Sequence, residues 1–248
     1  MKKVIRKIGI WIRNIILMLV ALSLFFVVLY KFVPVYFTPL MFIRAYEQIK
    51  DNKPVRMKHQ WVPLSKISPN MIQAVVASED NLFMEHNGFD FKQIDIAQKE
   101  AQKGKRVRGA STISQQTAKN VFLWQGKSYF RKVLEAYFTV LIEFVWGKER
   151  IMEVYLNSIE MGDGIYGVEA VSLAHFHKHA NRLSKREAAL IAATLPNPRK
   201  FNSAKPSAYM LKRQAKIMSL MGKIAIVDFN KKEDTKKKKD PPKKRKKK

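Results

Sequence analysis

The first apolar stretch of the chain is long enough to cross a membrane. Residues 14–30 carry no charged side chain and are rich in Ile, Leu, Val and Phe. With the apolar residues that flank them, they reach the length that a membrane-spanning helix needs. A cleaved signal peptide would have a shorter apolar core followed by a cleavage site of small residues. We therefore interpret residues 1–33 as a basic N-terminus followed by a retained membrane anchor.

Lysine and arginine are denser before this anchor than after it. The positive-inside rule then predicts a single membrane crossing, with the N-terminus in the cytoplasm and the bulk of the chain on the other side. A second apolar stretch, residues 39–43, is too short to span a membrane. A position at the membrane surface and a position in an ordinary protein core fit it about equally well.

The apolar positions after the anchor predict helices. Ser68 and Pro69 form a helix start, and this helix should run to Glu79 and Asp80. Further helices are expected at residues 111–122, 131–146, 148–157, 184–195 and 207–221. Residues 99–109 have the composition of a polar loop, and the sequence contains no evident pair of strands joined by hairpin-turn residues. We therefore predict an all-α fold for residues 34–225.

Charge and composition narrow the function. The formal net charge is +27, and residues 231–248 hold twelve Lys or Arg and three Asp or Glu, so about +18 (27 minus 9) belongs to the rest of the chain. A cationic surface favours anionic partners such as phosphates, nucleic acids or acidic lipids. There is no cysteine, which excludes disulfides and thiol chemistry. Residues 226–248 are Lys-rich and contain Pro-Pro, so we expect a disordered tail.

Two glutamates are candidates for catalysis. Glu79 and its neighbour Asp80 follow an apolar helix, and a poorly solvated carboxylate there can act as a general base; an inert surface pair is the alternative. Glu135 lies in an otherwise apolar helix, with Arg131 and Lys132 one turn before it. This group could be a surface ion pair, but an isolated carboxylate in such a helix is costly unless it is paired or used.

The segment from Gly109 to Gln116 is a candidate binding site for an anion. It combines the hydroxyls of Ser111 and Thr112 with the amides of Gln115 and Gln116 at a helix start, and Lys119 follows one turn later. Such groups can cradle a diphosphate. A polar helix start that is merely capped is the alternative. Residues 148–157 have the apolar spacing of a core scaffold.

Taken together and in order, these motifs resemble one enzyme family. The motifs are Glu79-Asp80-x-x-Phe83-x-x-His86-x-Gly88-Phe89-Asp90, Gly109–Gln116, Arg131-Lys132-x-x-Glu135, Lys148-x-x-Ile151-x-x-x-Tyr155-Leu156-Asn157 and Leu195-Pro196-Asn197-Pro198. Over residues 35–222 the chain is similar to the peptidoglycan glycosyltransferases (glycosyltransferase family 51), and in particular to their monofunctional, membrane-anchored members. Two features depart from the family pattern: Lys178-His179 stands where Lys-Pro is expected, and the Lys-rich tail has no counterpart.

The resemblance implies a lysozyme-like, all-α glycosyltransferase domain in the bacterial plasma membrane, with its catalytic part outside the cytoplasm. The implied reaction polymerises lipid II into β-1,4-linked glycan strands and releases polyprenyl diphosphate. Glu79 would be the base and Glu135 the second catalytic glutamate, which orients nearby cations or holds Mg²⁺ or another divalent cation. The implied substrate-binding residues are Asp80, His86, Arg108, Ser111, Thr112, Gln115, Gln116, Lys119, Arg131 and Lys132.

The expected partners are lipid II, the growing glycan strand and the membrane, and the resemblance also allows other cell-wall synthases or division proteins. The nearest alternative is a lysozyme-like peptidoglycan hydrolase, although a neutral glycosidic leaving group would not need the cations around Glu135. A membrane-anchored binder of nucleic acid or anionic lipid is a further alternative, suggested by the net charge. We expect no nucleic acid partner, because the folded part shows no nucleic-acid-binding motif.

Overall fold

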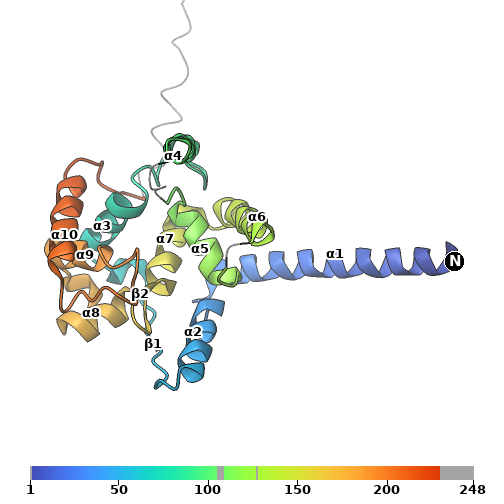
Figure 1. The fold of residues 1–248 in the computed structure, drawn as a ribbon, viewed down its shortest axis with the longest axis horizontal. Helices are drawn as coiled ribbons and strands as arrows, with labels where there is room; N and C mark the ends of the chain where they lie inside the picture. The colour runs from blue at the N-terminus through green and yellow to red at the C-terminus, as the bar shows by residue number, and fades with distance from the viewer. Residues whose placement is uncertain (1, 105–108, 127, 230–248) are drawn as a thin grey trace, which may run out of the picture.

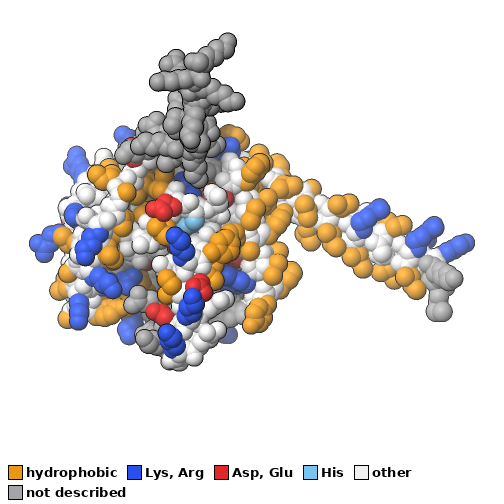
Figure 2. Space-filling view, turned by 90° about the horizontal axis from the view of Figure 1, so that it is seen from above, with side chains coloured by type: hydrophobic (Ala, Val, Ile, Leu, Met, Phe, Trp, Pro, Cys, Tyr) orange, Lys and Arg blue, Asp and Glu red, His pale blue; other side chains and the backbone are white. Residues whose placement is uncertain are grey.

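The computed structural model describes residues 2–104, 109–126 and 128–229. The helix α1 (Lys2–Phe32) projects away from the rest of the molecule (Figure 1). Within the described residues, it is the one helix long and apolar enough to cross a membrane. Figure 2 shows apolar side chains along α1, with Lys and Arg side chains toward its free end and on the surface of the folded part. This arrangement is compatible with a single-pass membrane anchor.

Six helices of the folded part lie where the sequence predicts them. They are α3 (Pro69–Glu79), α5 (Ile113–Phe122), α6 (Tyr129–Val145), α7 (Gly147–Ser158), α9 (Lys185–Ala192) and α10 (Ala208–Met221), and each begins at a Ser or Thr cap except α7, which directly follows α6. Thr112 and Ser184 each form a capping box with the third helical residue. The all-α prediction is confirmed.

Two packing groups meet around the core. Helix α3 packs against α9 and α10, and α5 packs against α6 and α7. Tyr155, Ile151 and Met71 are among the fully buried side chains between them. The end of α1 joins the second group, because the Trp146 indole N–H donates to the backbone oxygen of Val27 over 2.7 Å. The C-terminal end of α3 and the N-terminal end of α5 lie next to each other, because the Ile113 backbone N–H donates to the Asp80 carboxylate over 3.0 Å.

The expectation that the chain has no strand pair is wrong. Three short strands, β1 (Lys58–His59), β2 (Glu160–Gly162) and β3 (Ile165–Tyr166), form a sheet in the order β1-β3-β2. β3 is parallel to β1 and antiparallel to β2. Strands of two or three residues are too short to show an alternating pattern, so periodicity could not reveal them.

The segment after the first motif also differs from the prediction. Asp90 accepts a hydrogen bond from the Gln93 backbone N–H and caps α4 (Phe91–Gln102), a helix that the sequence reading did not identify. The predicted loop is therefore wrong at residues 99–102. Arg108 and nearly all of the Lys-rich tail lie outside the described residues.

The apolar residues 39–43 belong to α2 (Pro39–Lys50), and they do not all face the same way. Leu40 and Met41 are buried in a small cluster with Tyr166, whereas Phe42 is 58% exposed. The remaining elements are α8 (Val168–Phe176) and the 3₁₀ helices η1 (Leu64–Lys66) and η2 (Ala180–Arg182).

Candidate active site

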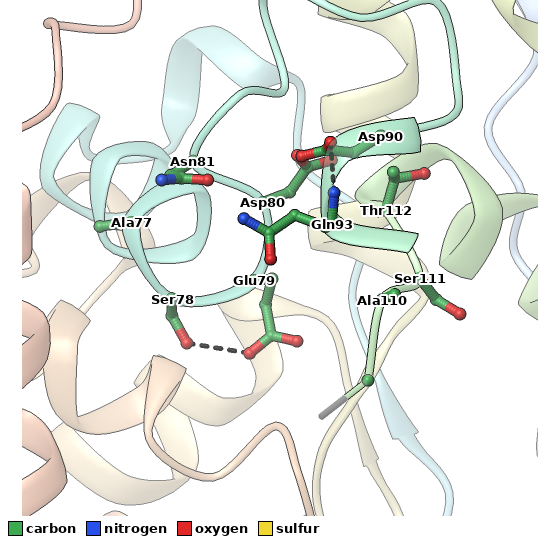
Figure 3. Close-up of a pocket in the computed structure, with 11 residues that line it drawn as sticks. Ala77, Ser78, Glu79, Asp80, Asn81, Asp90, Gln93, Ala110, Ser111 and Thr112 are labelled. Carbon is green, nitrogen blue, oxygen red and sulfur yellow. Dashed lines mark hydrogen bonds between the residues drawn. The ribbon is translucent and has the colours of Figure 1, made fainter. Parts of the chain in front are cut away.

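Glu79 is the last residue of α3, and its carboxylate is held by a donor on each oxygen. Oε1 accepts from the hydroxyl of Ser78 over 2.9 Å, and Oε2 accepts from the side-chain amide of Gln116 over 3.3 Å. The side chain is 15% exposed. Figure 3 shows the carboxylate between Ser78 and the segment that carries Ser111. Glu79 is therefore held in a defined orientation and can still be reached from outside.

Two cavities meet at Glu79, and together we call them the cleft. The smaller, about 220 Å³, lies between the end of α3, residues 109–112 and the start of α4 (Figure 3). The larger, about 840 Å³, is lined by α10 and by Gln116 and Pro196. Both include Ser78, Glu79, Gly109 and Ser111. A carboxylate at this junction can contact molecules bound on either side of it.

Asp80 makes different contacts from Glu79. Its side chain is 3% exposed and accepts from His86 Nε2 over 2.9 and 3.0 Å and from the Ile113 backbone N–H over 3.0 Å. His86 Nδ1 accepts from the Gly88 N–H, so Nε2 carries the proton that points to Asp80. Asp80 and His86 thus join the end of α3 to the start of α5, and their polar atoms bond inside the protein.

The start of α5 divides its side chains between the interior and the cleft. Thr112 and Gln115 are buried in the capping box, and the Thr112 hydroxyl also donates to the Gly88 oxygen over 2.6 Å. Ser111 lines both cavities, Thr112 lines the smaller one and Gln116 lines the larger one. Of the four predicted binding residues of this segment, Ser111, Thr112 and Gln116 therefore line the cleft, whereas Gln115 lines neither cavity.

The side chains around Glu135 form a cationic cluster. Glu135 is 3% exposed and pairs with Arg131 Nη1 over 2.9 Å and with Lys132 Nζ. Burial lowers the pKa of Lys119, the charge of Glu135 raises it in part, and Arg131 and Lys132 lower it further. Lys119 is three residues after Gln116, so both lie on one face of α5. The structure thus brings Lys119, Arg131, Lys132 and Glu135 together.

These residues do not fit a metal site built on Glu135. Both of its carboxylate oxygens are bound by cationic side chains, which disfavour a further divalent cation. Over residues 2–104, 109–126 and 128–229, no group of three or more His, Cys, Asp or Glu could hold a metal ion.

Three residues at the site were missed by the sequence reading. Ser78 and Arg213 contact each other over 3.4 Å beside Glu79, and the Tyr155 hydroxyl donates to the Gln116 side-chain oxygen over 3.2 Å. Burial, together with the charges of Glu79 and Asp80, raises the pKa of Tyr155 well above its usual range, so this hydroxyl stays a donor. Tyr155 was assigned to a core scaffold, and nothing local in the sequence relates Arg213 to Glu79.

Comparison with known proteins identifies the family. A family model described as Transglycosylase matches residues 46–222. The chain belongs to this family. The transglycosylase is 58% identical over 217 residues to a biosynthetic peptidoglycan transglycosylase of Bacteroides thetaiotaomicron, with 88% of each chain covered. A protein of the same name from Bdellovibrio bacteriovorus is 53% identical, with 84% of each chain covered. Another from Caulobacter vibrioides is 49% identical, with 86% of this chain and 92% of the other covered.

Membership in this family confirms the resemblance that the five motifs indicate. It also confirms that the protein is an enzyme of the glycosyltransferase class with a lysozyme-like fold. The alternative of a lysozyme-like hydrolase is not favoured, because the relatives are named as biosynthetic enzymes.

Proposed function

We propose that this transglycosylase polymerises lipid II into the β-1,4-linked glycan strands of peptidoglycan and releases polyprenyl diphosphate. The observation that carries the proposal is the position of Glu79 at the junction of two cavities, with a cationic cluster formed by Lys119 of α5 and by Arg131 and Lys132 of α6. One cavity can hold an acceptor sugar and the other a donor, so a single carboxylate can serve the reaction between them.

In this reaction, Glu79 is the general base. The acceptor hydroxyl oxygen forms a bond to the anomeric carbon of the donor while the bond from that carbon to the diphosphate oxygen breaks. The hydroxyl proton moves to Glu79, and the bonding electron pair leaves with the diphosphate. Attack opposite the leaving group converts an α-linked donor into a β-linked product. A glycosidase, in contrast, needs a general acid for its alkoxide leaving group.

The diphosphate leaves as a stable anion, so it needs positive charge and not a proton. Lys119, Arg131 and Lys132 supply that charge from a partly buried position, where electrostatic stabilisation is stronger than in water. Glu135 holds Arg131 and Lys132 in place through its two oxygens. The predicted divalent cation stays a prediction, and no step here depends on it.

Helix α1 would anchor the enzyme in the bacterial plasma membrane, with its N-terminus in the cytoplasm and the cleft outside. On that side the enzyme could contact the growing strand and other cell-wall synthases or division proteins.

A labelling experiment tests this orientation. The chain has no cysteine, so a single Lys212→Cys substitution provides one label site. A membrane-impermeant maleimide should label this variant in spheroplasts without lysis. Labelling only after lysis would contradict the orientation.

The activity test uses the full chain in detergent with lipid II and Mg²⁺, and the length of the glycan polymer is measured. Glu79→Gln should lower strand synthesis by about 10²–10⁴-fold, which is the usual contribution of a general base. Glu85→Gln is the matched control, because it makes the same chemical change at an exposed residue six positions later in the chain. Full activity of Glu79→Gln, or cleavage of preformed glycan by the wild type, would contradict the proposal.

A further inference from the structure

Arg213 lies beside the proposed catalytic base, although it is 135 residues from Ser78 in the chain. It belongs to α10, and its Nη2 is 3.7 Å from Glu79 Oε1 and 3.4 Å from Ser78 Oγ. The Arg213 side chain is 27% exposed and that of Glu79 is 15% exposed. Because most of this pair is withdrawn from water, solvent and salt screen it less than a pair on the open surface.

Ser78 connects Arg213 to the carboxylate. A serine hydroxyl has one hydrogen to donate, and it can accept from a second group at the same time. The Arg213 guanidinium donates to Ser78 Oγ, and the Ser78 hydroxyl donates to Glu79 Oε1 over 2.9 Å. The direction of the Ser78 hydrogen is therefore determined by Arg213, and this hydrogen keeps Oε1 in place.

The other carboxylate oxygen is held by an equivalent pair of residues. Tyr155 is fully buried and donates to the side-chain oxygen of Gln116, which turns the amide nitrogen toward Glu79 Oε2. The other charge next to Glu79 in the chain is Asp80, whose carboxylate bonds away from the cleft to His86 and Ile113. Arg213 is thus the cation that pairs with Glu79 among the described residues.

We propose that Arg213 is a positioning residue: its ion pair with Glu79 and its hydrogen bond to Ser78 keep the Glu79 carboxylate turned toward the cleft. The inference rests on the proposed role of Glu79 as the base. The fixed direction matters because a small displacement of a catalytic group slows the reaction strongly.

The experiment compares variants of the full-length enzyme in the lipid II assay, with kcat and KM measured for each. Arg213→Gln should lower kcat by about 10- to 100-fold, the loss expected for a misplaced catalytic group, and should leave KM nearly unchanged, because it displaces the base and not the substrate. Arg213→Lys keeps a charged donor at the same position and should recover most of the lost kcat.

Two further variants make the result specific. Ser78→Ala removes only the connecting hydroxyl, so it should lower kcat and leave KM nearly unchanged. It also tests the proposal if Arg213→Gln does not fold in a thermal melt. Lys212→Gln removes the same charge from the neighbouring, exposed position of α10 and should leave kcat and KM unchanged.

The outcomes separate this inference from the proposed function. An unchanged kcat of Arg213→Gln would overturn the positioning role. So would a rise in KM alone, which would make Arg213 a substrate-binding residue of the larger cavity. In both cases the wild type and Lys212→Gln still make polymer, so the proposed function stands. If neither of these two proteins makes polymer, both the proposed function and the inference are overturned.

Discussion

Replacing Asp80 by alanine should lower the free energy of unfolding of the protein, although Asp80 is next to the proposed base. The substitution removes the acceptor of two donors, His86 Nε2–H and the Ile113 backbone N–H. The Asp80 side chain is 3% exposed and that of His86 is 10% exposed, so water cannot readily replace the carboxylate. A buried donor left without an acceptor costs about 1–3 kcal/mol.

Leaving two such donors without an acceptor should lower the free energy of unfolding by about 4 kcal/mol. For a chain of this size, that loss corresponds to a fall in Tm of roughly 8–16 °C. Asp80→Asn keeps one acceptor oxygen and should lose about half as much. Glu79→Gln also keeps an acceptor oxygen for Ser78, and because its side chain is 15% exposed at the cleft, water can replace the bond to Gln116 that it loses. This variant should therefore melt within about 2 °C of the wild type.

The assay is a thermal melt of the full chain in detergent, followed by circular dichroism, with strand synthesis from lipid II measured on the same samples. We expect Asp80→Ala to lose stability and Glu79→Gln to lose activity alone. If Asp80→Ala melted like the wild type and yet made no glycan, its carboxylate would have to act on the substrate, and the assignment of its bonds to the fold would be refuted.

Three other predictions test the cations, the metal and the backbone. Burial lowers the pKa of Lys119, so its positive charge should be lost as pH rises through a value below that of an ordinary lysine; Lys119→Arg should extend kcat to higher pH, and an unchanged alkaline limb would remove this charge from the reaction. Chelation of Mg²⁺ should slow strand synthesis. Because the residues around Glu135 do not fit a metal site, Glu135→Gln should shift the half-saturating Mg²⁺ concentration by less than about tenfold, whereas the loss of a metal contact would shift it by at least that much. Gly167→Ala should cost at least about 1–3 kcal/mol in a thermal melt, because Gly167 has a φ of +80° and a Cβ there would lie 2.6 Å from the Asn157 oxygen; Gly222→Ala, with no neighbour closer than 3.7 Å, is the control and should change little.

Some features of this protein follow from short stretches of its sequence. The long apolar run predicts α1, since a spanning helix depends on local composition alone. Ser68-Pro69 predicts the start of α3, and the capping box of α9 follows from Ser184 and Glu187, because a cap is made by residues three or four positions apart. The order of five motifs was enough to identify the family.

Other features depend on contacts between distant segments, and a single sequence does not contain them in readable form. Glu79 and Asp80 are adjacent acidic residues, and both line the smaller cavity. The Glu79 side chain is 15% exposed, whereas that of Asp80 is 3% exposed and is bound by a backbone N–H 33 residues later. The strands β1 and β3 pair across more than one hundred residues, and Arg213 reaches Ser78 across 135. The sequence alone thus determined the long apolar helix α1, six helices of the folded part and the family. The tertiary structure decided how each motif side chain is buried and paired at the cleft, since burial and pairing arise only when α3, α5 and α10 pack together.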